Sequence, residues 1–480
     1  MVKMPLFAKI LEHCEGDRAR FHIPGHRQGM GLPRELREVV PEFYKMDLTE
    51  VPGLDDLHNP EGVIAEAQKL ASRLYGAGDT FFLVNGTTCG LQALILSTAG
   101  ENERVLVPRN AHRSVLGGLI LSGAVPEYLQ PEIIPHFEIA GAIPLDELKE
   151  KMSNGFNYKA VLALHPTYYG TVGDLTGLVD EAHKRDLPVI VDEAHGTHLY
   201  FHRQTPRGAL RCGADGVVQS VHKTGGSFTQ SSWLHLQGNL INKKRLKDAL
   251  RLVQTTSPSY ILLASLDAAR FQLAEEGKQI MERTLELAIK ARRSISEIKG
   301  LVLLDEKYSG KGLFHIDPTR LVISVKGLGL TGFQVKEILS SRYRVELEMA
   351  DLNNIVAVIS LGTTPEDVHM LVEALRDLST GQRPVAGGGQ RSMTLPPIPP
   401  LGLSPRKAWM AGSRGVKLEE AIGSISGEMV CVYPPGIPVI CPGEEITREV
   451  YDYLRQVRKL KLHCQGPEDP ELNTVRIIDH

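Results

Sequence analysis

The stretch DGVVQSVHKTGGSFTQSSWLH, residues 215–235, decides which fold the chain is expected to adopt. An apolar run that ends at Ser220 predicts a buried strand, and His222 and Lys223 follow it directly. Small and hydroxyl residues surround Lys223, and it has no acidic neighbour in the sequence. A lysine after a strand is usually a solvated loop cation, so the rest of the chain must show whether this one has a chemical role.

Similar apolar runs recur between about residues 60 and 260, separated by segments with helical periodicity. The runs are TFFLVNG, ERVLVPRN, KAVLALHP, LPVIVDEAH and DGVVQSVHK. Apolar strands that alternate with helices predict an α/β fold with a mainly parallel sheet covered on both faces. Ligands bind beyond the carboxyl ends of the strands in such sheets. The polar residues that end these runs are therefore candidates for an active site.

Groups at three of these strand ends suit one ligand. The segment NGTTCGLQALIL (85–96) opens a helix, whose free N–H groups at Gly86 and whose hydroxyls at Thr87 and Thr88 suit a phosphate. Asp192 suits a protonated ring nitrogen, because charges ~4 Å apart attract by about 1 kcal/mol in water but about 4 kcal/mol at an effective dielectric of 20. Lys223 suits an aldehyde, because an amine without an acidic partner stays available in its neutral form. The combination predicts pyridoxal 5′-phosphate, the electron sink of carbanion chemistry at amino acids.

Histidines end several of the same strands. We expect His112, in PRNAHRSV, to stack on the pyridine face, whereas a purely structural role is the alternative. His165 and His195 could be structural or functional. His58, in LDDLHNPEG, lies in a segment whose aspartates could face a cationic substrate or merely form a turn.

The remaining sequence predicts further segments around this domain. The strands TRLVISV and NNIVAVISL predict a smaller α+β domain, and GQRPVAGGGQRSMTLPPIPPLG predicts a linker. The prolines of VCVYPPGIPVICPGEEIT predict short strands and tight turns followed by a helix. The expected division is an N-terminal helical segment (1–30), a large cofactor-binding domain (31–296), a small α+β domain (297–380), a Gly/Pro-rich linker (381–402) and a C-terminal domain (403–480). The N-terminal helix should bury one face, made of Leu6, Phe7, Ile10, Leu11 and Cys14.

Composition excludes several classes of function. A net charge of −3 over 480 residues argues against partners that recognise bulk charge, such as nucleic acid or a membrane surface. No apolar run approaches the ~20 residues of a membrane span, and Lys9 and Glu12 interrupt any signal-like segment. The six cysteines show no metal-ligand spacing, so we expect reduced thiols, no metal site and a cytoplasmic location.

The order of motifs along the chain resembles that of a known family. The motifs are FHIPGHRQG (21–29), LDDLH (54–58), NGTTCG, PRNAHRS, HPTYYG, VDEAHGTH, QSVHKTGGSFTQSSWLH, TTSPSY (255–260) and YPPGIPVICPGE (433–444). Together they are similar to the bacterial Orn/Lys/Arg decarboxylases, which are fold type I pyridoxal-phosphate enzymes. The chain most resembles the biosynthetic arginine decarboxylases of Gram-positive bacteria, which make agmatine for polyamine synthesis.

The resemblance implies roles for individual residues. Lys223 would be the Schiff-base lysine, Asp192 the partner of the pyridinium and His112 the stacking residue, with Ala194 beneath the ring. Thr87, Thr88, Ser220 and His222 would surround the phosphate. Thr255 or Thr256 would reach the phosphate of a neighbouring subunit, which implies a homodimer or a larger homo-oligomer.

The expected reaction is α-decarboxylation of a basic L-amino acid, with arginine the first choice and lysine or ornithine the alternatives. Lys223 or His222 would return the proton to the α-carbon. A fold type I aminotransferase is a further alternative, but it needs an arginine clamp for the α-carboxylate, which the sequence does not identify. Candidates for recognition of the substrate's cationic side chain are Asp55, Asp56, His58, Glu348, Asp351 and Glu444.

Overall fold

The computed structural model describes residues 4–15, 19–39, 43–381, 393, 395–432 and 436–479. Its centre is a seven-stranded sheet in the order β1-β10-β9-β8-β6-β2-β3. The strands are β1 (Asp79–Leu83), β2 (Arg104–Pro108), β3 (Val125–Leu129), β6 (Tyr158–Leu164), β8 (Val189–Asp192), β9 (Gly216–Gln219) and β10 (Ser232–Leu236). Only β10 runs against the others in this sheet, because it pairs antiparallel with both of its neighbours. The expectation of a mainly parallel sheet is therefore confirmed.

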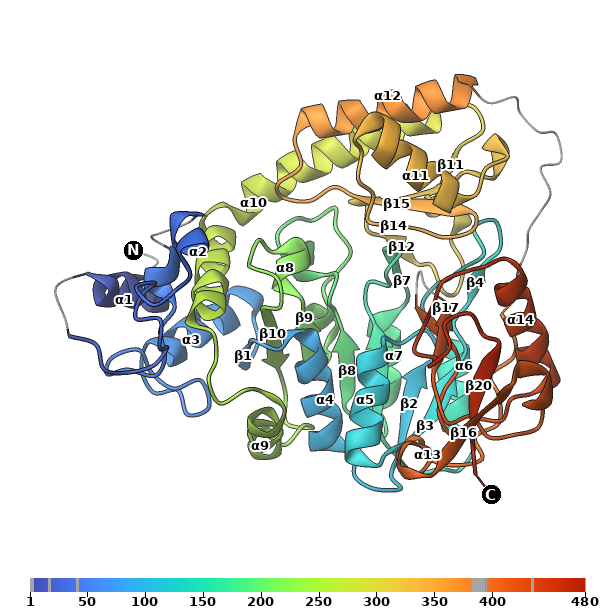
Figure 1. Cartoon of the computed structure of the whole chain (residues 1–480), viewed down its shortest axis with the longest axis horizontal. Helices are drawn as coiled ribbons and strands as arrows, with labels where there is room; N and C mark the ends of the chain where they lie inside the picture. Colours follow the sequence, from blue (N-terminus) through green and yellow to red (C-terminus); the bar gives the residue numbers. More distant parts are fainter. Residues whose placement is uncertain are drawn as a thin grey trace.

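Helices cover both faces of the sheet (Figure 1). One face carries α4 (Gly86–Thr98), α5 (Arg113–Ser122) and α9 (Lys243–Val253), and the other carries α3 (Val63–Tyr75), α6 (Leu145–Met152) and α7 (Leu175–His183). Successive residues of a strand pack into the apolar cores on opposite faces of the sheet. In β8, Val189 and Val191 pack on the α7 side and Ile190 packs on the α4 side. All four residues of β8 are buried, which explains its unbroken apolar sequence.

A 37-residue helix, α10 (Tyr260–Ser296), connects the large sheet to a smaller one (Figure 1). The smaller sheet has the order β11-β13-β15-β14 and is antiparallel throughout. Its elements are β11 (Val302–Leu303), β13 (Arg320–Ser324), β14 (Met349–Ala350), β15 (Asn354–Val358), α11 (Gly332–Tyr343) and α12 (Pro365–Gly381). A separate apolar core fills the space between this sheet and its helices. We propose domain boundaries near residues 297 and 403 on this basis.

The C-terminal region has its own core and two small antiparallel sheets, β16-β20 and β18-β17-β19. Its elements are α13 (Pro405–Met410), β16 (Ser413–Lys417), β17 (Val430–Val432), β18 (Ile437–Ile440), α14 (Arg448–Lys459), β19 (Cys464–Gln465) and β20 (Thr474–Ile478). Pro438 lies in β18, an edge strand, where its missing N–H costs nothing. The expected turn at residues 433–435 lies outside the described residues, as does most of the expected linker.

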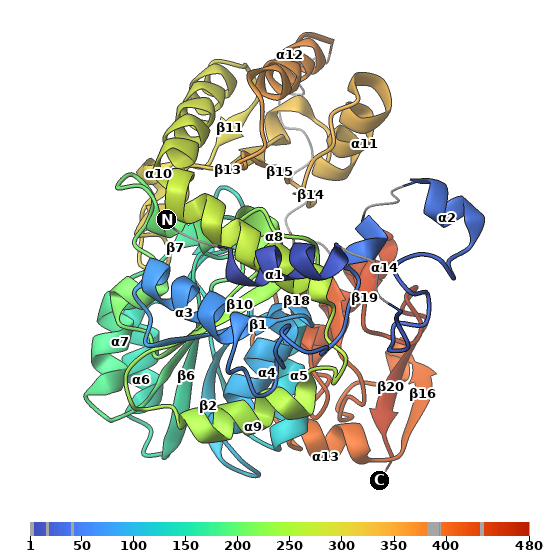
Figure 2. The same cartoon turned by 90° about the vertical axis from the view of Figure 1, so that its left-hand side faces the viewer.

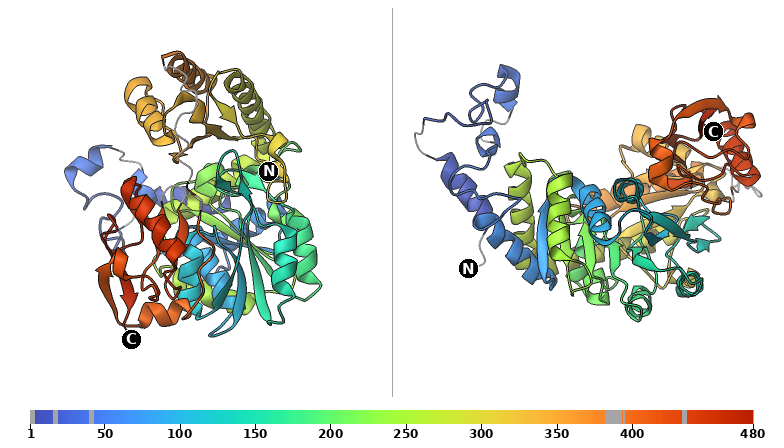
Figure 3. Two further views of the ribbon diagram at one scale, coloured as in Figure 1. Left: turned by 90° about the vertical axis from the view of Figure 1, so that its right-hand side faces the viewer. Right: turned by 90° about the horizontal axis from the view of Figure 1, so that it is seen from below.

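Helix α1 (Pro5–Cys14) lies along α10 (Figure 2). Leu6 and Ile10 are fully buried, and the Asp267 carboxylate of α10 accepts hydrogen bonds from the backbone N–H groups of Leu6 and Phe7. Leu11 is 41% exposed, so the prediction that it lies on the buried face was wrong. The buried face of α1 is narrower than the apolar pattern of the sequence indicates. A second short helix, α2 (Arg34–Val39), lies at the same end of the molecule, far from the C-terminal region (Figure 3).

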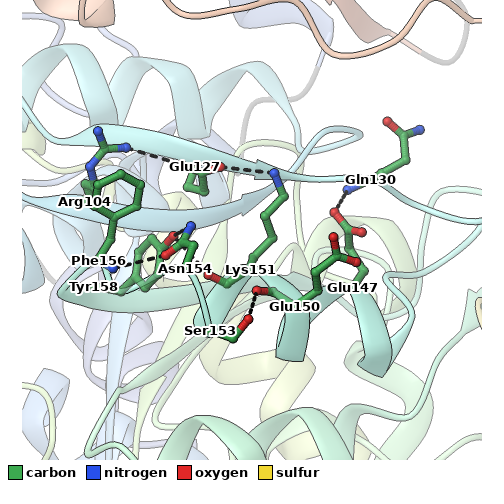
Figure 4. Close-up of polar contacts among 10 residues, drawn as sticks. All are labelled: Arg104, Glu127, Gln130, Glu147, Glu150, Lys151, Ser153, Asn154, Phe156 and Tyr158. Carbon is green, nitrogen blue, oxygen red and sulfur yellow. Dashed lines mark hydrogen bonds and ion pairs between the residues drawn. The ribbon is translucent and has the colours of Figure 1, made fainter.

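Charged residues of the edge strand β3, the start of β2 and helix α6 pair with one another near the surface (Figure 4). Glu127 of β3 accepts hydrogen bonds from Arg104 at 3.3 Å and Lys151 at 3.1 Å, and Arg104 lies 4.0 Å from the ring centroid of Phe156. Each of these ionic groups is partly exposed. No helix in the described part of the chain is both long and apolar enough to cross a membrane.

Candidate active site

A cavity of about 350 Å³ lies beyond the carboxyl ends of the parallel strands. Its size is that of a small-molecule site. Five of the residues expected to contact the cofactor line it, from the ends of four strands: Thr87, His112, Asp192, Ala194 and Lys223. The parallel topology brings them together, since each follows a strand whose carboxyl end meets this edge of the sheet.

Lys223 lies in α8 (Val221–Thr224), a single turn that follows β9. Its Nζ is 3.0 Å from Nε2 of His195, and no carboxylate of the described residues lies within 4 Å of it. Enclosure by the protein lowers the pKa of the Lys223 amine; Asp192 opposes that shift, Arg320 adds to it and Glu348 opposes it. The amine is therefore more available in its neutral form than that of a surface lysine.

Asp192 is the last residue of β8 and is 8% exposed. Its Oδ1 accepts a hydrogen bond from the backbone N–H of Ala194 at 3.1 Å, which fixes the carboxylate at the cavity wall. His112 faces the same cavity and also caps α5: its Nδ1 accepts from the backbone N–H of Ser114 at 3.2 Å. Burial lowers the pKa of His112, Lys223 and Arg113 add to the effect, and Asp192 opposes it. His112 is thus neutral near pH 7 and combines a structural with a cavity-facing position.

The first turn of α4 forms one end of the cavity. Gly86 begins the helix with φ +70°, a conformation that favours glycine, and the preceding strand β1 leads into it. The Thr87 and Ser220 hydroxyls are 2.9 Å apart, so β9 and α4 bring two hydroxyls to the same place. Thr88 is exposed in the same turn.

A carboxylate, Glu348, lines the cavity beside these groups. The Tyr168 hydroxyl donates to its Oε1 at 2.5 Å, and Oε2 has no hydrogen-bond partner among the described residues. Asp351, the neighbouring candidate, lies outside this cavity: it accepts from the Tyr169 hydroxyl at 2.9 Å and from Asn354. Burial raises the pKa of Asp351, against the effect of these hydrogen bonds.

The LDDLH segment does not reach the cavity of its own chain. Asp55 accepts hydrogen bonds from the backbone N–H groups of Asp56, Glu61, Gly62, Ile64 and Ala65. Burial would raise the pKa of Asp55, but these hydrogen bonds outweigh it and hold the pKa below its usual range. Asp55 therefore anchors the start of α3, and Asp56 is exposed on the surface. His58 Nε2 donates to the backbone oxygen of Thr255 at 2.8 Å. Thr255 and Thr256 are both exposed.

Glu444 is fully buried and is ion-paired with Arg109 at 2.5 and 2.9 Å. It also accepts the backbone N–H of Cys441 at 2.7 Å. The carboxylate thereby joins the C-terminal region to the end of β2, away from the cavity lining. A substrate cation would have to displace Arg109, so we correct the expected substrate role of Glu444 to a structural one.

Two histidines near the lysine are directed at backbone oxygens. His222 Nδ1 donates to the Ser231 carbonyl at 3.0 Å, and His165 Nε2 donates to the Arg207 carbonyl at 2.7 Å. Burial lowers the pKa of both, although each hydrogen bond opposes the shift, and the pKa of His165 falls to about 4. Neither ring is among the cavity-lining residues. His195, in contrast, lines the cavity and contacts Lys223.

Sequence reasoning missed three residues at this site. Tyr168 and Asn110 line the cavity, and Arg320 lies behind His195, with Nη2 2.6 Å from Nδ1 of that ring. Tyr168 and Asn110 lie in the motifs HPTYYG and PRNAHRS, each of which follows an apolar run, so their position after a strand is a usable signal. Arg320 begins a strand of the small domain, and nothing in its local sequence indicates that it reaches the large domain.

The residues present fit pyridoxal phosphate. The cavity joins hydroxyls and a helix start at Thr87, a carboxylate at Asp192 and an amine at Lys223, which match a phosphate, a ring nitrogen and an aldehyde. Asn110 adds a buried side-chain oxygen with no hydrogen-bond partner among the described residues. Among the described residues that line the cavity there is no arginine to clamp a carboxylate, as an aminotransferase requires.

Comparison with known proteins identifies relatives over nearly the whole chain. The family profile "Orn/Lys/Arg decarboxylase, major domain" matches residues 4–309, and "Orn/Lys/Arg decarboxylase, C-terminal domain" matches residues 396–473. The arginine decarboxylase of Bacillus anthracis is 42% identical over 477 residues, which are 99% of this chain and 97% of the relative. That of Bacillus subtilis (strain 168) is 41% identical over 478 residues, with the same coverage of both chains.

A solved structure shows the same fold. The lysine decarboxylase LdcF of Francisella novicida superposes with a TM-score of 0.86 at 22% identity and covers 99% of this chain and 81% of its own. The likeness extends from the large sheet through the smaller domains. At this identity it supports the architecture alone.

Proposed function

The chain belongs to the Orn/Lys/Arg decarboxylase family, and from that premise we propose that it converts L-arginine to agmatine and CO2 with pyridoxal 5′-phosphate. The observation that carries the proposal is the meeting of Lys223, Asp192 and Thr87 at one cavity whose lining also includes a carboxylate, Glu348. Arginine is favoured over lysine and ornithine because the arginine decarboxylases of two Bacillus species are alike in sequence to this chain from end to end.

The residues that we propose to hold the cofactor present suitable hydrogen-bonding and charged groups at the cavity. Thr87 and Ser220 would present hydroxyls, and Thr88 a backbone N–H of the α4 start, to a phosphate. The backbone N–H of Gly86, expected to be a further donor, is instead bonded to the Gln230 carbonyl at 2.8 Å. The Asp192 carboxylate would accept a hydrogen bond from the protonated ring nitrogen and keep it charged, and His112 and Ala194 would be the residues that contact the ring. When bound, the cofactor supplies the electron sink for the pair of electrons that CO2 leaves at the α-carbon.

The proton that replaces CO2 comes from Lys223 or His222 in our proposal. Lys223 is better placed, since its amine faces the cavity while the His222 ring donates to a backbone oxygen. Its lowered pKa makes it a better proton donor than a surface lysine.

The substrate's cationic side chain would meet Glu348. Glu348 is exposed at the cavity wall, and its carboxylate, with one oxygen that has no partner among the described residues, can accept a charge-assisted hydrogen bond from a guanidinium or ammonium group. The Tyr168 hydrogen bond fixes the orientation of this carboxylate. Asp55 is already occupied by backbone N–H groups, and Asp56 lies in the same segment, away from the cavity.

We further propose that the working unit is at least a homodimer in the cytoplasm. Thr255 and Thr256 are exposed and absent from the cavity of their own chain, and His58 holds the Thr255 backbone in place, which suits a role at a neighbouring subunit's phosphate. Cys89, Cys212, Cys431, Cys441 and Cys464 are buried free thiols, as in proteins of reducing compartments.

Product analysis tests the reaction. Holoenzyme is incubated separately with L-arginine, L-lysine and L-ornithine, and agmatine, cadaverine, putrescine and CO2 are quantified. We expect agmatine, with CO2 in equal amount and no amino transfer to 2-oxoglutarate. Cadaverine or putrescine as the main product would replace the substrate assignment, and amino transfer without CO2 would replace the reaction.

Paired variants test the substrate-binding role of Glu348. Glu348→Gln removes the charge beside the cavity, and we expect the KM for arginine to rise about tenfold, the effect of losing ~1.4 kcal/mol of binding. Glu346→Gln is the matched control, because Glu346 is exposed nearby, accepts from the Ser340 hydroxyl and does not line the cavity. Equal KM values in the two variants would show that another group binds the side chain.

A further inference from the structure

His195 is held between two basic side chains from different domains. Its Nε2 is 3.0 Å from Lys223 Nζ, and its Nδ1 is 2.6 Å from Nη2 of Arg320. His195 is 7% exposed and Arg320 is 1% exposed. Arg320 is the first residue of β13, so this contact connects the small domain to the lysine at the end of the large sheet.

The hydrogen-bonding capacity of arginine fixes the protonation of the ring. A guanidinium has five N–H donors and no acceptor, so Nδ1 of His195 must be the acceptor and carries no proton. In a neutral imidazole the proton then lies on Nε2, which faces Lys223. An N–H that points at Lys223 can be accepted by a neutral amine, which has a lone pair, but not by an ammonium group, which has none.

We propose that Arg320 is a positioning residue that acts through His195 to hold Lys223 as a neutral amine, ready to attach the cofactor. The inference rests on the proposed function for the role of Lys223 in catalysis. It concerns the protonation of the chain's own side chains, which can be measured without cofactor or substrate.

The surrounding charges act in the same direction. His195 faces Lys223, Arg320, His112 and His198, and burial together with these basic groups lowers its pKa well below the ordinary value, so the ring stays neutral. Lys223 faces Asp192 and Glu348, which favour its charged form, and Arg320, which opposes it. Loss of Arg320 would remove a positive charge and free Nδ1 of His195 to take the proton. Both changes would favour the ammonium form of Lys223.

Neighbouring groups confine Arg320 and place a charge beside it. Asp317 forms an ion pair with His198 at 3.0 Å and accepts from Thr319. Burial would raise the pKa of Asp317, but His198 and Arg320 lower it to about 2, so a negative charge lies close to the arginine. Gly170 leaves the space for the arginine stem, since a Cβ there would lie 2.6 Å from Cγ of Arg320. Nε of Arg320 is buried with no hydrogen-bond partner among the described residues, so the bond to His195 is the contact that orients the guanidinium.

Amine reactivity in the cofactor-free protein tests the inference. Lys223 is labelled competitively with acetic anhydride from pH 6 to 11, and peptide mass spectrometry gives its titration midpoint, with Lys151 as an internal surface reference. In the wild type we expect Lys223 to titrate below Lys151. Arg320→Met should raise the Lys223 midpoint by about one pH unit, a tenfold loss of reactivity at neutral pH, and Arg320→Lys should restore most of it.

Two controls separate positioning from general damage. Arg270→Met removes another fully buried arginine, whose carboxylate partner is Asp267, and should destabilise the fold without moving the Lys223 midpoint. His195→Gln keeps an acceptor oxygen and a donor N–H and should leave the midpoint near that of the wild type. An unchanged midpoint in Arg320→Met, or an equal shift in Arg270→Met, would overturn the proposal.

A measurement on the unmodified chain avoids dependence on folded variants. ¹⁵N NMR of histidine-labelled cofactor-free protein, with His195→Gln to assign the signal, reports which ring nitrogen of His195 is protonated. We expect protonated Nε2 and bare Nδ1 from pH 6 to 9. A proton on Nδ1 would refute the inference whatever the enzyme is found to decarboxylate, and failure of the decarboxylase assay would leave these results interpretable.

Discussion

Charged side chains gather at the edge strand β3 and at the carboxyl ends of the parallel strands, and the two groups differ in how they are paired. At the edge strand, Glu127 is bonded to Arg104 and to Lys151 in partly exposed ion pairs (Figure 4). At the carboxyl ends, Lys223 and Asp192 line one cavity, yet no carboxylate of the described residues lies within 4 Å of the lysine.

This difference in pairing distinguishes charged residues with a structural role from charged residues available for catalysis. Exposed ion pairs satisfy each other and water and contribute about 0–1 kcal/mol each. Groups kept apart in a partly enclosed cavity gain no such pairing, but they retain their hydrogen-bonding capacity for a ligand. Removing a residue should therefore affect activity strongly in the cavity and little at the edge strand.

Substitution of the two lysines should give the largest contrast. We expect Lys223→Ala to lower decarboxylation at least ~10⁴-fold, because the attachment point and an acid–base group are lost together, and to remove the visible absorbance of the holoenzyme. Lys151→Ala should retain activity within about twofold. Steady-state assays and absorbance spectra measure both, and residual turnover above that level in Lys223→Ala would assign the lysine's role elsewhere.

Substitution of the two carboxylates should give the next largest effect. Asp192→Asn preserves shape but removes the charge opposite the ring nitrogen, and a loss of about 4 kcal/mol corresponds to a roughly 10³-fold fall in kcat. Glu127→Gln is the matched surface change, and its kcat should stay within about twofold of the wild type. Comparable kcat values for the two variants would contradict the distinction between the cavity and the edge strand.

A third comparison sets a buried ion pair against an exposed one. Glu444→Ala leaves Arg109 charged and buried without its carboxylate, and we expect it to lower the free energy of unfolding by about 3–5 kcal/mol. Glu127→Ala should cost less than about 1 kcal/mol. Denaturant titration measures both. A raised KM for arginine in Glu444→Ala with unchanged stability would instead restore a substrate role for Glu444.

Much of this site could be predicted from the sequence because most of its residues stand next to the apolar strands that position them. Lys223, Asp192, His112 and Thr87 each follow an apolar strand directly, and a parallel sheet brings such positions to one edge whatever the loop details. The strand β10 was harder to predict, because Ser232 and His235 break the apolar run although both are buried. The edge strand β3 contains Pro126, which argues against a strand unless its edge position is known.

The roles of the remaining residues could not be predicted, because they depend on contacts between segments that are distant in the sequence. Glu348 and Asp351 are three residues apart and similar in sequence, yet only Glu348 lines the cavity, since strand β14 between them reverses the side to which they point. Asp55 and Glu444 resembled free acids, and their partners, backbone N–H groups and Arg109, become visible only in the fold. Arg320 reaches His195 across 125 residues of sequence.

The smallest expected effect concerns stability in acid and compares a buried with an exposed histidine. Burial lowers the pKa of His165, at the end of β6, to about 4, against about 6.5 in an unfolded chain. Between these pH values His165 binds a proton in the unfolded chain but not in the folded one. The contribution of neutral His165 to the free energy of unfolding is therefore complete above pH 6.5 and is lost as the pH falls towards 4. The full loss is about 3 kcal/mol at ~1.4 kcal/mol per pKa unit.

His165→Gln stays neutral and keeps a donor for the Arg207 carbonyl, so its unfolding free energy should fall less than that of the wild type between pH 7 and 4.5. His315→Gln, on an exposed side chain, should follow the wild type in the same denaturant titrations. Parallel pH curves for His165→Gln and the wild type would show that His165 does not contribute to acid sensitivity.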